Sequence, residues 1–120
     1  MKNKPQQKKY CGPDRCPVDF ALEIIGGRWK GVIIYHLLSG KKRFGEIRRL
    51  IPAATQRMIT LQLRELEKND LVQRKVYLEV PPKVEYSLTP LGETLRPTVD
   101  ELMTWGTRVQ KIHNIPLIKT

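Results

Sequence analysis

The spacing of the apolar residues changes twice along this chain of 120 residues, and that change limits the folds open to it. Up to about residue 69 the apolar residues recur every three or four positions, which is the period of an amphipathic helix. Between Val72 and Leu88 they alternate with polar residues, as in a half-buried strand. From Leu91 onwards the helical period returns. The order is therefore a group of helices, a β-hairpin and a further helix.

Four helices are predicted before the first change of spacing. Pro17 suits the first position of the first helix, and Gly26-Gly27 ends it, because glycine accepts the left-handed cap conformation at little cost. The three later helices are expected over Arg28–Leu38, Phe44–Leu50 and Gln56–Asn69. Apolar residues lie on most sides of the second helix, which indicates the buried centre of the fold.

A β-hairpin is predicted after these helices. Its strands are expected over Val72–Leu78 and Val84–Leu88, and the loop between them contains Pro81 and Pro82, which cannot lie inside a central strand. Two short helices that are joined by a tight turn at Pro52 and followed by a hairpin form a winged helix-turn-helix. The expected fold class is therefore mainly α with a small antiparallel β-hairpin.

A long apolar stripe marks the C-terminal helix, which is expected over about residues 90–113. The members of the stripe recur at helical spacing and are Leu91, Leu95, Val99, Leu102, Gly106 and Val109. Pro97 lies inside this run, so a kink or a break is expected near Arg96. The stripe is longer than a small monomer needs to cover, which points to a partner surface.

Positive charge is concentrated in one part of the chain. The formal net charge is +10, and the segment from Arg28 to Arg64 carries nine basic residues and one acid, Glu46. From Glu85 to the end of the chain the charges balance. Such an excess attracts polyanions. One region is therefore expected to face an anion, and double-stranded DNA is the partner that a winged helix-turn-helix binds.

The predicted helix Gln56–Asn69 fits the major groove of DNA with its N-terminal end toward the bases. Arginine can pair with guanine, glutamine with adenine, and threonine can touch a base or a phosphate. The candidate DNA-binding residues are Gln56, Arg57, Thr60 and Arg64 on this helix, Arg43, Arg48 and Arg49 beside the phosphate backbone, and Lys83 at the wing tip. Each of them could equally lie on a solvated face. Leu61 lies close to the polar face and could touch a thymine methyl group or a neighbouring helix.

Short segments in a fixed order run through nearly the whole chain. They are Cys16-Pro17-Val18, Ile25 to Lys30, Arg43 to Ile47, Gln56 to Thr60, Leu63 to Glu67, Val80 to Thr89, Leu91-Gly92 and Trp105-Gly106. With these spacings the chain resembles the HxlR family of bacterial winged helix-turn-helix regulators. The chain departs from the family pattern in the two turns beside the predicted helix Gln56–Asn69. Asp70 replaces a usual glycine, and Ala53-Ala54 replaces a commoner Gly-Ile pair. Aspartate accepts the left-handed conformation less well than glycine, so the resemblance does not determine the exact angle of this helix.

The resemblance implies a homodimeric transcriptional regulator, most often a repressor, with a dimer interface formed by the N-terminal and C-terminal helices. The interface residues expected are Leu91, Leu95, Val99, Leu102, Trp105 and Val109. Two-fold symmetry predicts an inverted-repeat operator with half-site centres about 34 Å apart, or a multiple of that distance. Residues 11–120 are expected to form the DNA-binding domain, including the dimerisation helix. Residues 1–10 are expected to form a flexible basic arm that is either disordered or contacts DNA.

Cys11 and Cys16 are the two cysteines of the chain. Members of the family sense oxidants or electrophiles through the cysteine that matches Cys16, so the resemblance implies a small oxidant or electrophile as signal. Cys16 is expected at the start of a helix beside Arg15, where positive charge favours a thiolate. Cys11 could resolve an oxidised Cys16, within the chain or across the dimer. The alternative is that Cys16 is a small buried residue that packs at the interface.

Other classes of function lack a sequence signal. The chain has two histidines and no nucleophile–base set, glycine-rich phosphate loop or metal-ligand spacing, so an enzyme, a cofactor or a metal site is not expected. No apolar run reaches the ~20 residues of a membrane helix. The N-terminus lacks the apolar region of a signal peptide, so a cytoplasmic protein is expected. A basic module for RNA or for an anionic surface stays open as the alternative to a DNA regulator.

Overall fold

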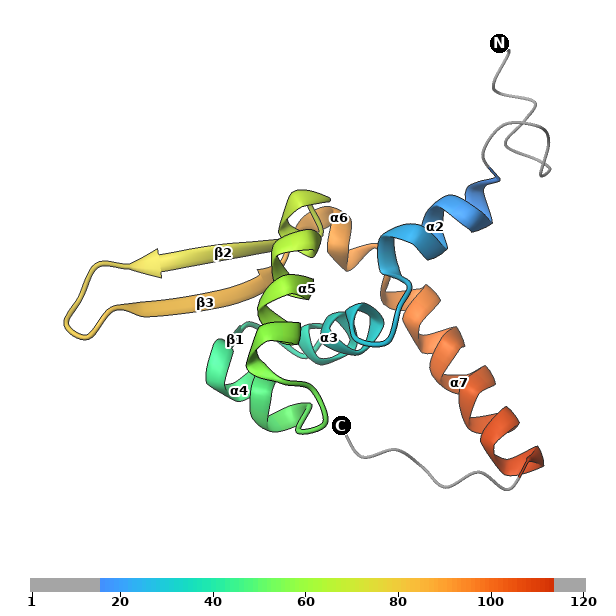
Figure 1. Cartoon of the computed structure of the whole chain (residues 1–120). Helices are drawn as coiled ribbons and strands as arrows, with labels where there is room; N and C mark the ends of the chain where they lie inside the picture. Colours follow the sequence, from blue (N-terminus) through green and yellow to red (C-terminus); the bar gives the residue numbers. More distant parts are fainter. Residues whose placement is uncertain (1–15, 114–120) are drawn as a thin grey trace, which may run out of the picture.

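The computed structural model describes residues 16–113 as a helical body with a projecting wing. Its elements, in chain order, are α2 (Pro17–Ile25), α3 (Lys30–Leu37), β1 (Lys42–Arg43), α4 (Phe44–Leu50), α5 (Gln56–Lys68), β2 (Val72–Tyr77), β3 (Lys83–Leu88), α6 (Pro90–Glu93) and α7 (Arg96–Ile112). In Figure 1 the hairpin β2–β3 extends to the left of the body, and α7 extends to the lower right. The fold is mainly α with a small antiparallel sheet, as predicted.

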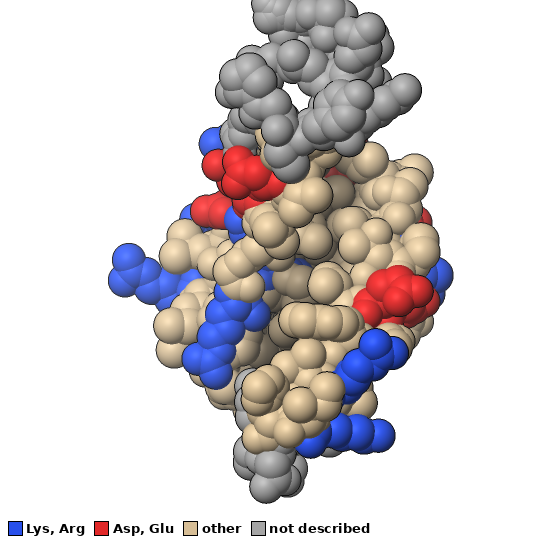
Figure 2. Space-filling model, turned by 90° about the vertical axis from the view of Figure 1, so that its right-hand side faces the viewer, with Lys and Arg blue, Asp and Glu red and all other residues tan. Residues whose placement is uncertain are grey.

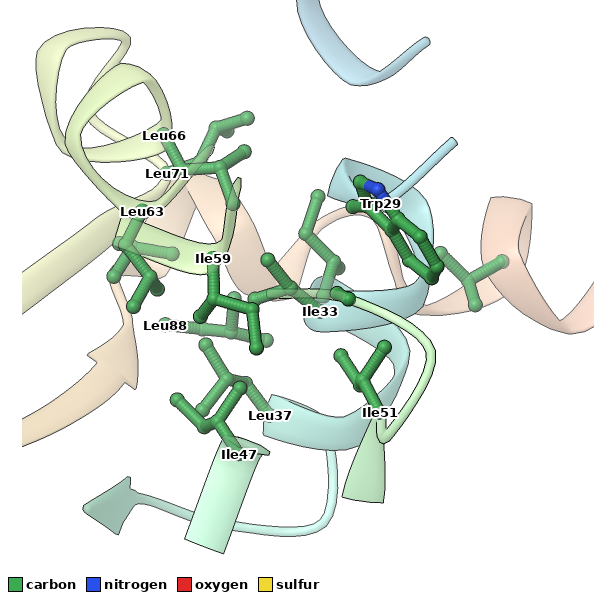
Figure 3. Packing of buried hydrophobic residues seen from close by; sticks show 14 residues of the cluster. Trp29, Ile33, Leu37, Ile47, Ile51, Ile59, Leu63, Leu66, Leu71 and Leu88 are labelled. Atoms are coloured by element: carbon green, nitrogen blue, oxygen red, sulfur yellow. The ribbon is translucent and has the colours of Figure 1, made fainter. Parts of the chain in front are cut away.

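Helix α3 is the centre of the core, as its apolar sequence predicted. Helices α4, α5 and α7 and strand β3 all contact it. Its buried apolar side chains are Ile33, Ile34 and Leu37. Helix α5 turns a single stripe inward, which consists of Ile59, Leu63 and Leu66. Figure 3 shows side chains of both helices meeting those of Ile47, Ile51 and Leu88.

The sheet has three strands in the order β1-β3-β2, and both pairings are antiparallel. Strand β1, which places Lys42 opposite Tyr86, was not predicted. Two residues are too few to show a period of two, so only the pairing with β3 defines this strand. The predicted hairpin is present, although β2 ends at Tyr77 and β3 begins at Lys83, each one residue from its expected bound.

The predicted break near Arg96 is confirmed, and it divides the C-terminal region into α6 and α7. Pro97 lies in the first turn of α7, where its missing N–H leaves no intrahelical bond unmade. The Arg96 guanidinium donates to the carbonyl oxygen of Leu38 (2.9 Å) and to Oε1 of Glu93 (3.0 Å). Arg96 therefore attaches the start of α7 to the end of α3.

Asp70 adopts the left-handed conformation with φ of 62°. The backbone N–H of Leu71 donates to the Leu66 carbonyl (2.9 Å), and that of Asp70 donates to the Glu67 carbonyl (3.0 Å). This pair of bonds is the Schellman pattern that ends a helix, with Leu71 and Leu66 both buried beneath it. The turn after α5 is therefore the one that a glycine would make, although the residue is an aspartate.

Within residues 16–113, no helix is both long and apolar enough to cross a membrane. In the same part of the chain, no three His, Cys, Asp or Glu side chains are grouped so that they could hold a metal ion. The basic arm predicted over residues 1–10, and Cys11, lie outside the described residues.

Candidate nucleic-acid interface

Two local hydrogen bonds define where helices α4 and α5 begin. The backbone N–H of Arg43 donates to Oε1 of Glu46 (2.8 Å), and the N–H of Met58 donates to Oγ1 of Thr55 (3.1 Å). Both bonds satisfy N–H groups that the start of a helix leaves without an intrahelical partner. Between the helices, the N–H of Ala54 donates to the Ile51 carbonyl (3.1 Å) and closes a short turn. Helices α4 and α5 are thus the two helices of a helix-turn-helix.

Helix α5 presents a polar face away from its buried stripe. Gln56, Arg57 and Arg64 on this face are exposed, and Thr60 is partly buried. These four side chains line one shallow hollow, together with Leu61. The structure therefore brings together the four residues that were predicted to approach the bases. It also places Leu61, which is 44% exposed, on the same surface.

Five exposed arginines of the helix-turn-helix form no ion pair with any residue in the described part of the chain. They are Arg43, Arg48, Arg49, Arg57 and Arg64. Other basic residues do have a glutamate partner, namely Lys30, Lys41, Arg74, Lys83 and Arg96. Guanidinium groups without a carboxylate nearby are available for phosphate oxygens and base edges. These five residues, called here the arginine cluster, all come from the predicted DNA-binding set.

A buried lysine supports α5 from its inner side. The Nζ of Lys30 on α3 lies 2.5 Å from Oε1 of Glu65 on α5, and Lys30 is only 8% exposed. The hydrogen bond from Lys30, and its charge, hold the pKa of the Glu65 carboxyl below its usual value. This supporting role was not predicted from the sequence. The available signal was a charged residue at the start of an apolar helix, because a buried charge needs a partner.

Lys83 does not lie at the tip of the wing, where it was predicted. Lys83 is the first residue of β3 rather than the tip of the wing, and its side chain is 27% exposed. Its Nζ lies 3.7 Å from Oε2 of Glu85 and 4.6 Å from the centre of the Tyr77 ring. A hydrogen bond from Tyr77 lowers the pKa of Glu85, which stabilises the carboxylate that pairs with Lys83. At the tip itself Leu78 and Val80 are 98% and 99% exposed.

A second surface, formed by α2 and α7, is largely apolar. Exposed apolar residues lie on several sides of these two helices, and together they define what is called here the α2–α7 face: Val18, Leu22, Leu102, Met103, Trp105 and Ile112. Leu22, Leu102 and Met103 line a groove of about 440 Å³ between α2, α3 and α7. Figure 2 looks onto this side of the molecule, where charged side chains lie mainly around the margin and uncharged ones surround a central hollow.

The six residues predicted for the dimer interface do not share one surface. Leu102 and Trp105 are exposed on the α2–α7 face, at 51% and 62%. Val99 is 6% exposed and belongs to the chain's own core, and Leu95 packs against that core. The break at Arg96 separates Leu91 and Leu95 from α7, and Val99 is buried because α7 packs on α3. The two remaining residues are Leu91, exposed on α6, and Val109, partly buried on α7.

Cys16 is the N-cap residue of α2 and is partly buried. Its carbonyl oxygen accepts a hydrogen bond of 2.9 Å from the N–H of Phe20, so it stands at the first turn of the helix, as predicted. Its sulfur is part of a disulfide bond in the structure. Cys16 is thus at a helix N-terminus, next to the α2–α7 face rather than next to the arginine cluster.

Three comparisons with known proteins agree with this architecture. The family model described as HxlR-like helix-turn-helix matches residues 24–114. The HTH-type transcriptional regulator YybR of Bacillus subtilis (strain 168) is 57% identical over 102 residues, which cover 83% of this chain and 82% of YybR. The solved structure of the redox regulator HypR in its oxidised form has 59% identity and a TM-score of 0.75, over 78% of this chain and 96% of that chain. Diamide-treated YodB from B. subtilis has 41% identity and a TM-score of 0.67, over 78% and 93%.

The family match spans the helix-turn-helix, the wing and α7. YybR is named a transcriptional regulator and HypR a redox regulator, and the match to YybR covers most of both chains. The resemblance seen in the sequence is therefore confirmed. The chain belongs to the HxlR-like helix-turn-helix family and is a DNA-binding transcriptional regulator.

Proposed function

We propose that the protein is a homodimeric repressor that binds an inverted-repeat operator and responds to an oxidant or electrophile through Cys16. The observation that carries the proposal is the arginine cluster, five exposed arginines of the helix-turn-helix that have no acidic partner among the described residues. We also propose that the protein is cytoplasmic, because a repressor must be in the same compartment as its operator.

In this proposal α5 lies in the major groove and α4 lies against the phosphate backbone. Gln56, Arg57, Thr60 and Arg64 share one hollow on the outer side of α5, which suits contact with neighbouring base edges. Arg43, Arg48 and Arg49 supply affinity that does not depend on sequence, because they neutralise phosphates and release counterions. Lys83 contributes from the wing, where Glu85 and Tyr77 hold its side chain in place.

The proposed dimer uses the α2–α7 face. Leu22 and Leu102 line its groove, and these two residues and Trp105 are each more than half exposed. A soluble monomer rarely leaves large apolar patches in water. A two-fold axis through this face would present two copies of α5 to one side of a DNA duplex. Val99 is left out of the proposed interface, because it is already buried within the chain.

The redox part of the proposal comes from Cys16 and from the relatives. HypR is named a redox regulator, and a structure of YodB was determined after diamide treatment. Diamide takes two electrons and two protons from two thiols, which leaves a disulfide and a hydrazine. At Cys16 the new bond would act on the N-terminal end of α2, which forms part of the proposed interface. We propose that this changes the spacing of the two α5 helices and so the affinity for the operator.

The test of DNA recognition is a selection from random duplexes with the purified full-length protein at about 0.15 M salt. We expect an inverted repeat as the selected sequence. Arg57→Ala should weaken binding to it by about 5- to 150-fold, the cost of one lost base contact. Arg108→Ala, which removes an exposed arginine on α7, is the matched control and should leave the affinity unchanged.

Two results would contradict the proposal. Salt-sensitive binding without any selected sequence would leave only a basic surface, and binding to structured RNA as tight as to DNA would favour an RNA module. A reporter gene behind the selected operator tests the repressor role, because an activator would raise its expression when the protein is present.

A further inference from the structure

Leu61 lies where an amphipathic helix does not usually place a leucine. It is two residues from the buried Ile59, which puts it about 200° around the helix axis. Its side chain is therefore directed away from the core, and it is 44% exposed. The neighbours one turn away on this outer face are Arg57 and Arg64.

The surroundings of Leu61 are polar and belong entirely to α5. The hollow that it lines is shared with Gln56, Arg57, Thr60 and Arg64, and within residues 16–113 no other element lines it. No residue of a neighbouring helix in the described part of the chain lines this hollow beside Leu61. Leu61 is an apolar group set among the residues that are proposed to face the bases.

One apolar group is displayed in the major groove of DNA, and it is the C5 methyl group of thymine. We propose that Leu61 contacts this methyl group and selects thymine at one position of each half-site. The inference rests on the proposed function and extends it, because it names a base that the hydrogen-bonding residues of α5 do not identify. Arg57 and Arg64 on either side would fix the helix against the neighbouring base pairs or phosphates.

The chain contains a matched control on the same helix. Met58 is 43% exposed, nearly the same as Leu61, but it does not line the hollow. Replacing either residue by alanine removes a similar apolar side chain and introduces a good helix former, so both variants should fold. Thermal unfolding followed by circular dichroism checks that they do.

The experiment replaces each thymine of the selected operator in turn by deoxyuridine, which removes only the C5 methyl group. For the wild-type protein, one position in each half-site should lose about fourfold in affinity, as expected for one methyl group taken out of contact. Leu61→Ala should bind the thymine and deoxyuridine operators equally well. Met58→Ala should keep the fourfold difference.

The inference is overturned if no thymine methyl group affects wild-type binding, or if the effect persists in Leu61→Ala. These results can be told apart from failure of the proposed function. If the wild-type protein selects no sequence, the proposed function and the role of Leu61 are both overturned. If it binds a selected sequence with an affinity that does not depend on the methyl groups, only the role of Leu61 is overturned.

Discussion

The hydroxyl group of Thr89 donates a 2.6 Å hydrogen bond to the carbonyl oxygen of Asp70 and so joins the end of α5 to the start of α6. The hydroxyl oxygen of Thr89 also accepts a 3.0 Å hydrogen bond from the N–H of Gly92, which caps α6. Thr89 is 6% exposed, so water cannot easily replace either bond. One side chain therefore links the turn that ends α5 to the region that leads into α7.

Replacing Thr89 by valine should lower the free energy of unfolding by about 1–3 kcal/mol, because a buried carbonyl and a helix N–H both lose their partner. Thr89→Ser keeps the hydroxyl and should retain most of the stability. Urea unfolding followed by circular dichroism measures both variants. Equal stability of the valine and serine variants would mean that the hydroxyl contributes little.

Asp70→Gly should stabilise the protein by about 0.5–1 kcal/mol, because glycine adopts a positive φ without the steric cost that an aspartate pays. Asn69→Gly is the matched control. Asn69 has φ of −90°, so glycine relieves no strain there and should not stabilise. The comparison is made by urea unfolding, and a gain that is the same at both positions would refute the argument from φ.

The Lys30–Glu65 pair predicts a stability that depends on pH. The pKa of Glu65 is lowered in the folded protein from its ordinary value of 4.5. The contribution of the pair is therefore fully present above that value, and it is lost as the pH falls through the lower folded pKa.

The measurement for this pair is the free energy of unfolding between about pH 6 and pH 3. Glu65→Gln should make the acid-induced loss of stability smaller. Lys30→Met should have the same effect on the slope, since it removes the partner that lowers the pKa. A slope unchanged in both variants would show that Glu65 titrates alike in the folded and unfolded chains.

Trp105→Glu should raise the dissociation constant of the proposed dimer by at least about 30-fold, because a carboxylate would replace a large apolar side chain at the interface. Trp105 is 62% exposed in the single chain, so the protomer should still fold. Val76→Glu is the control, since Val76 is an exposed apolar residue on the wing. Analytical ultracentrifugation reports both, and a dimer that survives the Trp105 change would place the interface elsewhere.

Cys16→Ser should abolish the response of DNA binding to diamide while leaving binding under reducing conditions unchanged. The reason is that a serine hydroxyl cannot form a disulfide, whereas its size is close to that of the thiol. Operator affinity is measured before and after diamide for both proteins. A variant that responds as the wild type does would exclude Cys16 as the sensor.

Local pattern was enough to predict much of this protein. The helical order, the stripe of Ile59, Leu63 and Leu66, and the break near Arg96 were all predicted from the sequence. The exposure of Arg57 and Arg64 on one face of α5 follows from the same periodicity. These features depend on residues within a few positions of one another, and the repeat of a helix relates such residues directly.

Tertiary packing alone decided the rest. Lys42 forms a strand only because Tyr86 lies opposite, and Val99 enters the core only because α7 packs on α3. Lys83 lies beside the Tyr77 ring because β2 pairs with β3. Each outcome depends on a partner contributed by another element, and the spacing of residues within one element carries no information about that partner.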